Sequence, residues 1–217
     1  RPVMKRYLIQ SLAILALGTS AYSQAPAPAA DAPKVKVDVK RVVPGEQGTP
    51  DFSAGNVNMK RWRPKKWFEL DAEFEIKVPQ DAGGRNGSFS GLQANVYLVF
   101  NSQTKDGKYE AAKATLTLTS VPASESCHVL AYVSPSDLRA ILQRDTFTAT
   151  TDIRGWGIEF VVNGQRMAGE GNPKPTAGNV WWEKTENLAI REGVIKAKSE
   201  TPFAILFGDY DVEAKTR

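Results

Sequence analysis

Most of the chain alternates apolar and polar residues in steps of two. Residues 35–40 read VKVDVK, and every second residue from Phe68 to Val78 is apolar while the positions between them are charged. A helix would need apolar residues spaced by ~3.6 positions, whereas the side chains of a strand point alternately to opposite faces. The pattern therefore predicts strands at 35–40 and 67–78, each with one buried face.

Further segments share this pattern or its apolar content, and turn-forming residues separate them. We expect strands at 92–100, 114–119, 127–133, 156–162 and 203–207. The pairs Asp106-Gly107 and Asn163-Gly164 tolerate the positive φ angles of tight hairpins. Both pairs therefore predict hairpin turns.

One short helix is predicted after the strand at 127–133. Ser134 is suited to cap a helix, Pro135 to occupy its first position and Asp137 its third. Leu138 and Ile141 then share one apolar face. This helix would cross between strands.

The strands, turns and helix together predict the fold class. They indicate an all-β, immunoglobulin-like antiparallel β-sandwich with one short crossing helix, and a closed barrel is the alternative. The single Cys excludes the disulfide-bonded form of the immunoglobulin fold. Residues 187–199 are ambiguous, because Gly193 weakens a helix there and the apolar spacing favours neither structure.

The N-terminal residues predict export. Met4-Lys5-Arg6 precede an apolar run, and the small residues Ala21 and Ser23 suit a cleavage site, so 1–23 reads as a signal peptide with a short upstream extension. The apolar run is shorter than the ~20 residues of a membrane span. We expect a protein of the periplasm, the outer membrane surface or the extracellular space, with no transmembrane segment after cleavage.

The remaining chain divides into a tether and one domain. Residues 24–34 are rich in Ala and Pro and predict a flexible tether, and 35–217 form a single domain. The chain has a formal net charge of +4. The signal segment holds basic residues and no acidic ones, so the exported part is close to neutral. Global charge therefore gives no reason to expect a nucleic-acid partner.

Composition limits the chemistry. With one Cys and one His, the chain can hold neither a disulfide framework nor a Cys- or His-rich metal centre, and we expect no cofactor and no metal. His128 lacks a nucleophile motif nearby, so we expect no enzyme. Cys127 is interpreted as a buried thiol, with pairing between chains as the alternative.

The first candidate binding segment combines cations with indoles. Its residues are Lys60, Arg61, Trp62, Arg63, Lys65, Lys66 and Trp67. Such a cluster suits an anionic ligand with a stacking group, for example a sulfated or sialylated glycan or an anionic lipid. A solvated loop that balances the acidic face of the next strand is the alternative.

The second candidate is the pair Trp181 and Trp182. Adjacent residues of a strand point to opposite faces, so one indole would be buried and the other exposed. An exposed indole could stack on a sugar or anchor a protein partner. Packing of both indoles in the core or at a sheet edge is the alternative.

The carboxylates give a third and weaker candidate. Glu69, Asp71, Glu73 and Glu75 share one strand face, and residues 209–213 place further acids two positions apart. Paired carboxylates serve hydrolases only when they face each other across a cleft. We interpret both groups as solvated strand surfaces.

Three short segments resemble a known family: KWFELD at 66–71, YVSP at 132–135 and TPFA at 201–204. They are similar to small exported proteins of Verrucomicrobia, a group that includes a protein of a mucin-degrading gut bacterium encoded near type IV pilus assembly components. The resemblance spans Val35–Asp211. It implies an immunoglobulin-like fold and a role in pilus formation or surface contact, and it transfers no enzymatic residues.

These observations favour a non-catalytic exported protein, an accessory protein-binding component of a type IV pilus-like or envelope assembly. Its partners would be envelope or pilus assembly proteins. A glycan-binding module for host or mucin glycans is the first alternative, and a carboxylate-dependent hydrolase is the second. A pilin subunit is disfavoured, because Ser23 stands where a pilin start would place Glu after Gly18.

Overall fold

The computed structural model describes residues 35–216, apart from 53, 54, 57, 59 and 178. The predicted signal peptide at 1–23 and the predicted tether at 24–34 lie outside the described residues.

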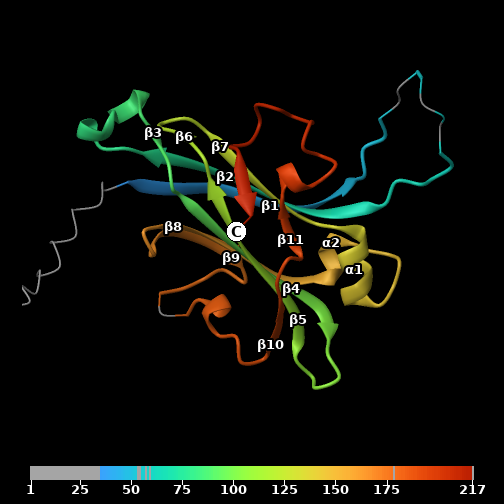
Figure 1. Cartoon of the computed structure of the whole chain (residues 1–217). Helices are drawn as coiled ribbons and strands as arrows, with labels where there is room; N and C mark the ends of the chain where they lie inside the picture. Colours follow the sequence, from blue (N-terminus) through green and yellow to red (C-terminus); the bar gives the residue numbers. More distant parts are fainter. Residues whose placement is uncertain (1–34, 53–54, 57, 59, 178, 217) are drawn as a thin grey trace, which may run out of the picture. The chain divides into compact units, whose positions relative to one another are not determined.

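The first layer is a four-stranded antiparallel sheet in the order β1-β2-β7-β11 (Figure 1). Its strands are β1 (Lys36–Gly48), β2 (Lys66–Lys77), β7 (Cys127–Val133) and β11 (Ile195–Ala197). β1 runs beyond its predicted end at residue 40, because it pairs with β2 from Lys36 opposite Lys77 to Gly48 opposite Lys66.

The second layer is a six-stranded sheet in the order β10-β5-β4-β8-β9, with β12 also paired to β5. Its strands are β4 (Gln93–Gln103), β5 (Tyr109–Leu118), β8 (Ile153–Val162), β9 (Gln165–Asn172), β10 (Leu188–Arg191) and β12 (Ala214–Thr216). All pairs are antiparallel except β10 with β5. A small separate pair joins β3 (Ser88–Phe89) to β6 (Val121–Pro122).

Two helices connect the sheets. α1 (Pro135–Leu142) and α2 (Ala149–Asp152) follow β7 of the first sheet and precede β8 of the second. The predicted cap is present, since Ser134 Oγ accepts a hydrogen bond of 3.1 Å from the Asp137 amide. Four single-turn 3₁₀ helices are η1 (Gln80–Ala82), η2 (Gly84–Asn86), η3 (Trp181–Glu183) and η4 (Lys198–Glu200).

The core lies between the two sheets. The apolar positions of β2 and of β4 that the alternation assigned to one face are buried, from Phe68 to Ile76 and from Ala94 to Phe100. Phe74 and Phe160 meet at the centre with ring centroids 4.5 Å apart. Each such side chain contributes about 1.5–3 kcal/mol by leaving water. The predicted all-β sandwich is confirmed, and the predicted crossing helix, α1, is followed on the same connection by a second and shorter helix, α2.

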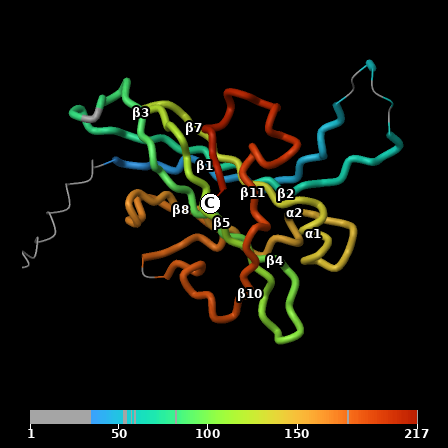
Figure 2. Tube along the Cα trace, in the orientation of Figure 1, coloured from blue at the N-terminus to red at the C-terminus, as the bar shows by residue number. Residues whose placement is uncertain are grey.

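The strand predicted at 203–207 is wrong, because this segment is a series of turns. Phe203 is buried, but Ile205 and Phe207 are exposed. Phe207 has φ +52°, which a strand does not accommodate. Figure 2 shows the segment as part of the red loop beside β7. This loop is tied to β7 by a hydrogen bond that the Val212 amide donates to the His128 carbonyl.

The ambiguous region 187–199 contains β10, β11 and the start of η4. Gly193, with φ +73°, lies in the turn between the two strands. A helix here is excluded because the region pairs in turn with β5 of one sheet and β7 of the other.

Candidate functional site

The β1–β2 loop is fixed where it joins the sheet. The Thr49 amide and Thr49 Oγ1 each donate a hydrogen bond of 2.9 Å to the Lys65 carbonyl. Trp67 Nε1 in turn donates to Thr49 Oγ1 at 3.0 Å. The basic residues before Trp67 therefore leave the sheet from a defined position.

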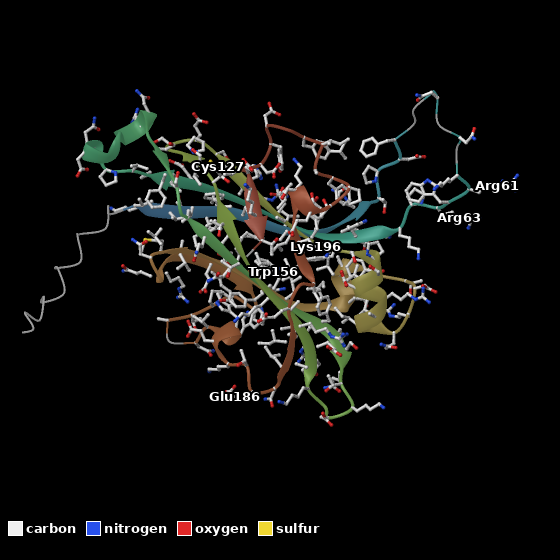
Figure 3. All side chains as sticks on the ribbon, in the orientation of Figure 1. Arg61, Arg63, Cys127, Trp156, Glu186 and Lys196 are labelled. Carbon is white, nitrogen blue, oxygen red and sulfur yellow. The ribbon has the colours of Figure 1, made fainter. Side chains whose placement is uncertain are left out.

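The predicted basic segment is exposed except at its end. Lys60, Arg61, Trp62, Arg63, Lys65 and Lys66 are all exposed. Figure 3 shows Arg61 and Arg63 on the part of the loop that extends away from the sheets. Trp67 is 8% exposed and packs edge-on against Phe203, so it is a structural residue and is not available for stacking on a ligand.

Helix α1 and strand β11 complete a groove beside this loop, which we call the cationic groove. A hollow of 760 Å³ is lined by Trp62, Arg63 and Lys65 of the loop, by Arg139 of α1 and by Lys196 of β11, with the α1 N-terminus between them. A second hollow of 410 Å³ shares Lys65, Pro135 and Arg139 with the first. The sequence pattern predicted the loop residues as a binding segment, but it gave no sign that Arg139 and Lys196 belong to the same site.

Three cations of the groove have no ion-pair partner in the part of the chain that the structure describes. Among the described residues, no ion pair joins Arg63, Lys65 or Lys196 to a carboxylate, whereas Arg139 is paired with Asp145 at 3.3 Å. Asp137, which also lines the hollow, accepts a hydrogen bond from Ser134 Oγ at 2.6 Å. The Trp62 indole is 46% exposed. Together these side chains suit an anionic surface that also offers a flat group for stacking.

Lys66 lines the second hollow and not the cationic groove, and its charge is engaged by a carboxylate. Its Nζ lies 2.5 Å from Glu46 Oε2. This hydrogen bond, with a smaller contribution from the Ala149 amide, lowers the pKa of Glu46 below its usual range. The pair ties β1 to β2, and the Glu46 contact with Ala149 ties β1 to α2.

Trp181 and Trp182 lie in the 3₁₀ helix η3 and not in a strand, so the predicted alternation of faces is wrong. Trp182 is buried, stacks on Tyr97 at 5.7 Å and donates from Nε1 to Glu159 Oε2 at 3.3 Å. It is held on the outer face of the second sheet, and it is structural. Trp181 is half-buried and lies perpendicular to its neighbour.

Trp181 forms one wall of a mostly apolar hollow of 410 Å³, which we call the Trp181 hollow. The lining residues are Val99, Tyr109, Arg154, Gly155, Pro173, Trp181, Lys184 and Leu188. Arg154 lies 4.2 Å above the Tyr109 ring. The sequence did not identify this hollow, because the parallel pairing of β10 with β5 brings Leu188 opposite Tyr109 from a distant part of the chain.

The carboxylates of β2 hold other parts of the protein in place and do not face one another across a cleft. Asp71 accepts a hydrogen bond of 2.6 Å from the Tyr210 hydroxyl, and its other oxygen lies 2.8 Å from His128 Nδ1. The His128 ring also stacks on the Tyr210 ring. Glu73 accepts a bond from Ser126. The contacts of Asp71 and His128 with Tyr210 fasten the segment after η4 to the first sheet.

The acids at 209–213 do not lie on the strand surface that the sequence predicted: Asp209 and Asp211 lie in a turn and a bend, and Glu213 directly precedes β12. Asp211 pairs with buried Lys198 at 2.5 Å. Within the part of the chain that the structure describes, no group of three or more His, Cys, Asp or Glu side chains is arranged to hold a metal ion.

Cys127 is buried at the start of β7, with 3% of its surface exposed. Burial, followed by the nearby charges of Glu125 and Glu75, raises the pKa of its thiol to about 11. The thiol is therefore protonated near neutral pH.

No described helix is long and apolar enough to span a bilayer.

Comparison with known proteins places the chain among related sequences. A family model matches residues 28–217. A crystal structure of a protein from Akkermansia muciniphila superposes with a TM-score of 0.70 and 18% sequence identity, covering 83% of this chain and 93% of that chain. No curated protein matches the chain. At this identity the structural match establishes the sandwich fold alone.

Proposed function

Because the chain belongs to a pilus-associated family of Verrucomicrobia proteins, we propose that it is a non-catalytic, exported accessory protein that binds partner proteins in a type IV pilus-like or envelope assembly. The family is extracytoplasmic and is not a known enzyme family. The protein would act by docking and not by chemical conversion.

The cationic groove supports this proposal. It combines an exposed indole, Trp62, with Arg63, Lys65 and Lys196, whose charges are not neutralised within the described chain. The loop that carries these residues is fixed at its base by Thr49. A preorganised aromatic and cationic surface of this kind favours a partner with an acidic patch and a flat apolar group.

The test is capture of assembly proteins from envelope fractions by the tagged chain. We expect the wild-type protein to recover pilus or envelope assembly proteins identified by mass spectrometry. The variant Trp62→Ala/Arg63→Glu/Lys65→Glu should lose them, and Lys105→Glu/Lys108→Glu, which reverses charge on the exposed β4–β5 hairpin, should retain them. Equal recovery by both variants, or no recovery by the wild type, would refute the proposal.

Glycan binding is a second candidate function, and the exposed Trp62 beside free cations favours it. Such a site suits sulfated or sialylated sugars of host or mucin glycans. Of the four indoles in the two candidate segments, the buried Trp67 and Trp182 are not available for stacking, which leaves Trp62 and Trp181. A glycan array would decide: binding that Trp62→Ala or Trp181→Ala abolishes supports this function, and binding indifferent to both removes it.

The location is also part of the proposal. We expect cleavage after Ser23, so the exported chain should begin at Gln24 and carry a short Ala/Pro-rich tether before the domain at 35–217. N-terminal sequencing of the protein from the periplasm, the outer membrane and the medium would give both the cleavage site and the compartment. An uncleaved cytosolic protein would contradict it.

A further inference from the structure

The segment between η4 and β12 presents an apolar tip to water. Ile205 is 75% exposed and Phe207 is 63% exposed. We call residues 204–209 the apolar loop. Side chains of this size gain stability when they leave water, and a group of exposed apolar side chains is typical of a binding surface.

The apolar loop is held firmly at both ends. On one side, Phe203 stacks on Tyr132 at 4.8 Å and meets Trp67 at 5.6 Å. On the other side, Tyr210 is hydrogen bonded to Asp71, and Lys198 Nζ donates to the Phe207 carbonyl at 2.9 Å. The exposed side chains are therefore presented in a fixed arrangement, which lowers the entropy cost of docking them.

The Trp181 hollow has the complementary properties. Val99, Trp181 and Leu188 give it apolar walls, and its volume of 410 Å³ lies within the usual range of about 300–1,000 Å³ for binding pockets. Arg154 and Lys184 contribute positive charge, and no carboxylate lines this hollow. The Trp181 Nε1 donor is shielded from water and has no acceptor among the described residues. An acceptor on a guest that reached this donor would remove the cost of leaving it unsatisfied.

The apolar loop and the Trp181 hollow are also complementary in charge. Asp209 follows the exposed Phe207 after one glycine and is itself exposed. Among the described residues, no ion pair involves Asp209, Arg154 or Lys184. The apolar loop thus offers apolar side chains followed by a carboxylate, and the hollow offers apolar walls next to two cations.

The two features lie on opposite outer faces of the sandwich. The loop is anchored on the first sheet through Asp71 of β2 and His128 of β7, and the hollow opens on the second sheet over Val99 of β4 and Gly155 of β8. A copy cannot fill its own hollow. When two different patches of the same protein bind each other, the copies associate head to tail. Such copies form open chains unless the rotation from one copy to the next closes a ring.

We propose that the apolar loop of one copy docks in the Trp181 hollow of a second copy, so that the exported chains associate head to tail. This contact uses neither Trp62, Arg63, Lys65 nor Lys196 of the cationic groove, and it does not depend on the proposed binding of partners there. Phe207 or Ile205 fills the hollow, and Asp209 pairs with Arg154 or Lys184.

The test uses analytical ultracentrifugation of the exported chain over a range of concentrations. We expect the wild-type mass to rise beyond a dimer without a fixed end point. Ile205→Ala/Phe207→Ala and Trp181→Ala should each weaken association by about tenfold or more, and circular dichroism should show that both remain folded. Trp62→Ala, in the other groove, should associate like the wild type.

The decisive experiment mixes the two variants. The loop variant keeps its hollow and the hollow variant keeps its loop, so an equal mixture should form a one-to-one heterodimer and nothing larger. A wild type that is monomeric, a species that stops at a dimer, or a mixture that stays monomeric would each overturn the proposal. Recovery of partners through the cationic groove is measured separately and would be unaffected by that result.

Discussion

At the scale of single residues, the Cys127 thiol shows how burial controls reactivity. Burial raises its pKa to about 11, so only a very small fraction is thiolate near neutral pH. We expect the folded protein to react with a thiol reagent such as iodoacetamide at least ~100-fold more slowly at pH 8 than the protein unfolded in guanidinium. Equal labelling of both forms, or a disulfide-linked dimer in the exported protein, would contradict this prediction.

A second residue prediction concerns Tyr210. Burial, and then its hydrogen bond to Asp71, raise its pKa above the ordinary value of 10.0. The folded state therefore holds this proton more tightly, and the resulting stability is present below pH 10 and lost as the pH rises above it. Tyr210→Phe should lower the free energy of unfolding by about 0.5–1.5 kcal/mol at pH 7.

Urea titrations from pH 7 to 11 would measure the effect of Tyr210. The difference between wild type and Tyr210→Phe should shrink at alkaline pH, because above pH 10 the unfolded chain releases the Tyr210 proton while the folded protein still holds it. Tyr97 and Tyr132 also have raised pKa values, mainly through burial. Both residues are present in wild type and variant, so their contribution to the pH dependence of stability cancels in the difference. A difference that stays constant across this range would show that Asp71 does not hold the Tyr210 proton.

At the scale of elements, η3 is seated on the second sheet through two glycines. A Cβ at Gly157 would lie 2.4 Å from a Trp182 ring carbon, and a Cβ at Gly171 would lie 2.6 Å from another. Gly157→Ala should therefore destabilise the protein by about 1–3 kcal/mol. Gly45→Ala is the matched control, because a Cβ there meets nothing within 4 Å.

Chemical denaturation of these variants would separate a local clash from a general intolerance of side chains in strands. Adding Trp182→Ala to Gly157→Ala should recover part of the loss, since the ring that the new methyl meets is then absent. If Gly157→Ala is as stable as Gly45→Ala, Trp182 is not packed on the sheet as described.

The strands also show which elements the sequence can predict. The strand predicted at 127–133 coincides with β7, and the helix predicted after Ser134 is α1. Both predictions succeed because alternation and helix capping are local patterns of sequence. The strand predicted at 203–207 is wrong, since apolar residues indicate burial but do not distinguish a strand from turns packed on an outer face. The short strands β10 and β12 exist only through pairing with β5, which no local pattern encodes.

The same limit applies to the candidate sites. Trp62, Arg63 and Lys65 are neighbours in sequence, so composition alone located them. Arg139 and Lys196 join them only because α1 and β11 reach the base of the β1–β2 loop. The fold also reassigns Trp67, which composition grouped with the cations, to a contact with Phe203.

At the scale of the whole molecule, the two proposed contacts differ in the force that drives them, and salt should separate them. Contact through the cationic groove depends on exposed charges, and the screening length falls from about 10 Å at 0.1 M salt to about 3 Å at 1 M. Docking of the apolar loop depends mainly on burial of Ile205 and Phe207, which salt does not weaken. Partner capture should therefore fall by about tenfold or more over this range, while the sedimenting mass of the chain alone changes little.

Paired measurements on one preparation would make this comparison, with captured partner quantified by blotting and mass by ultracentrifugation. Arg63→Gln/Lys65→Gln should reduce partner capture at low salt and flatten its salt dependence, because fewer charges remain to be screened. The same variant should leave self-association unchanged, since neither residue lines the Trp181 hollow. A parallel loss of both contacts with salt would mean that one charged surface carries both. The assignment of partner binding to the cationic groove and of self-association to the apolar loop and the Trp181 hollow would then fail.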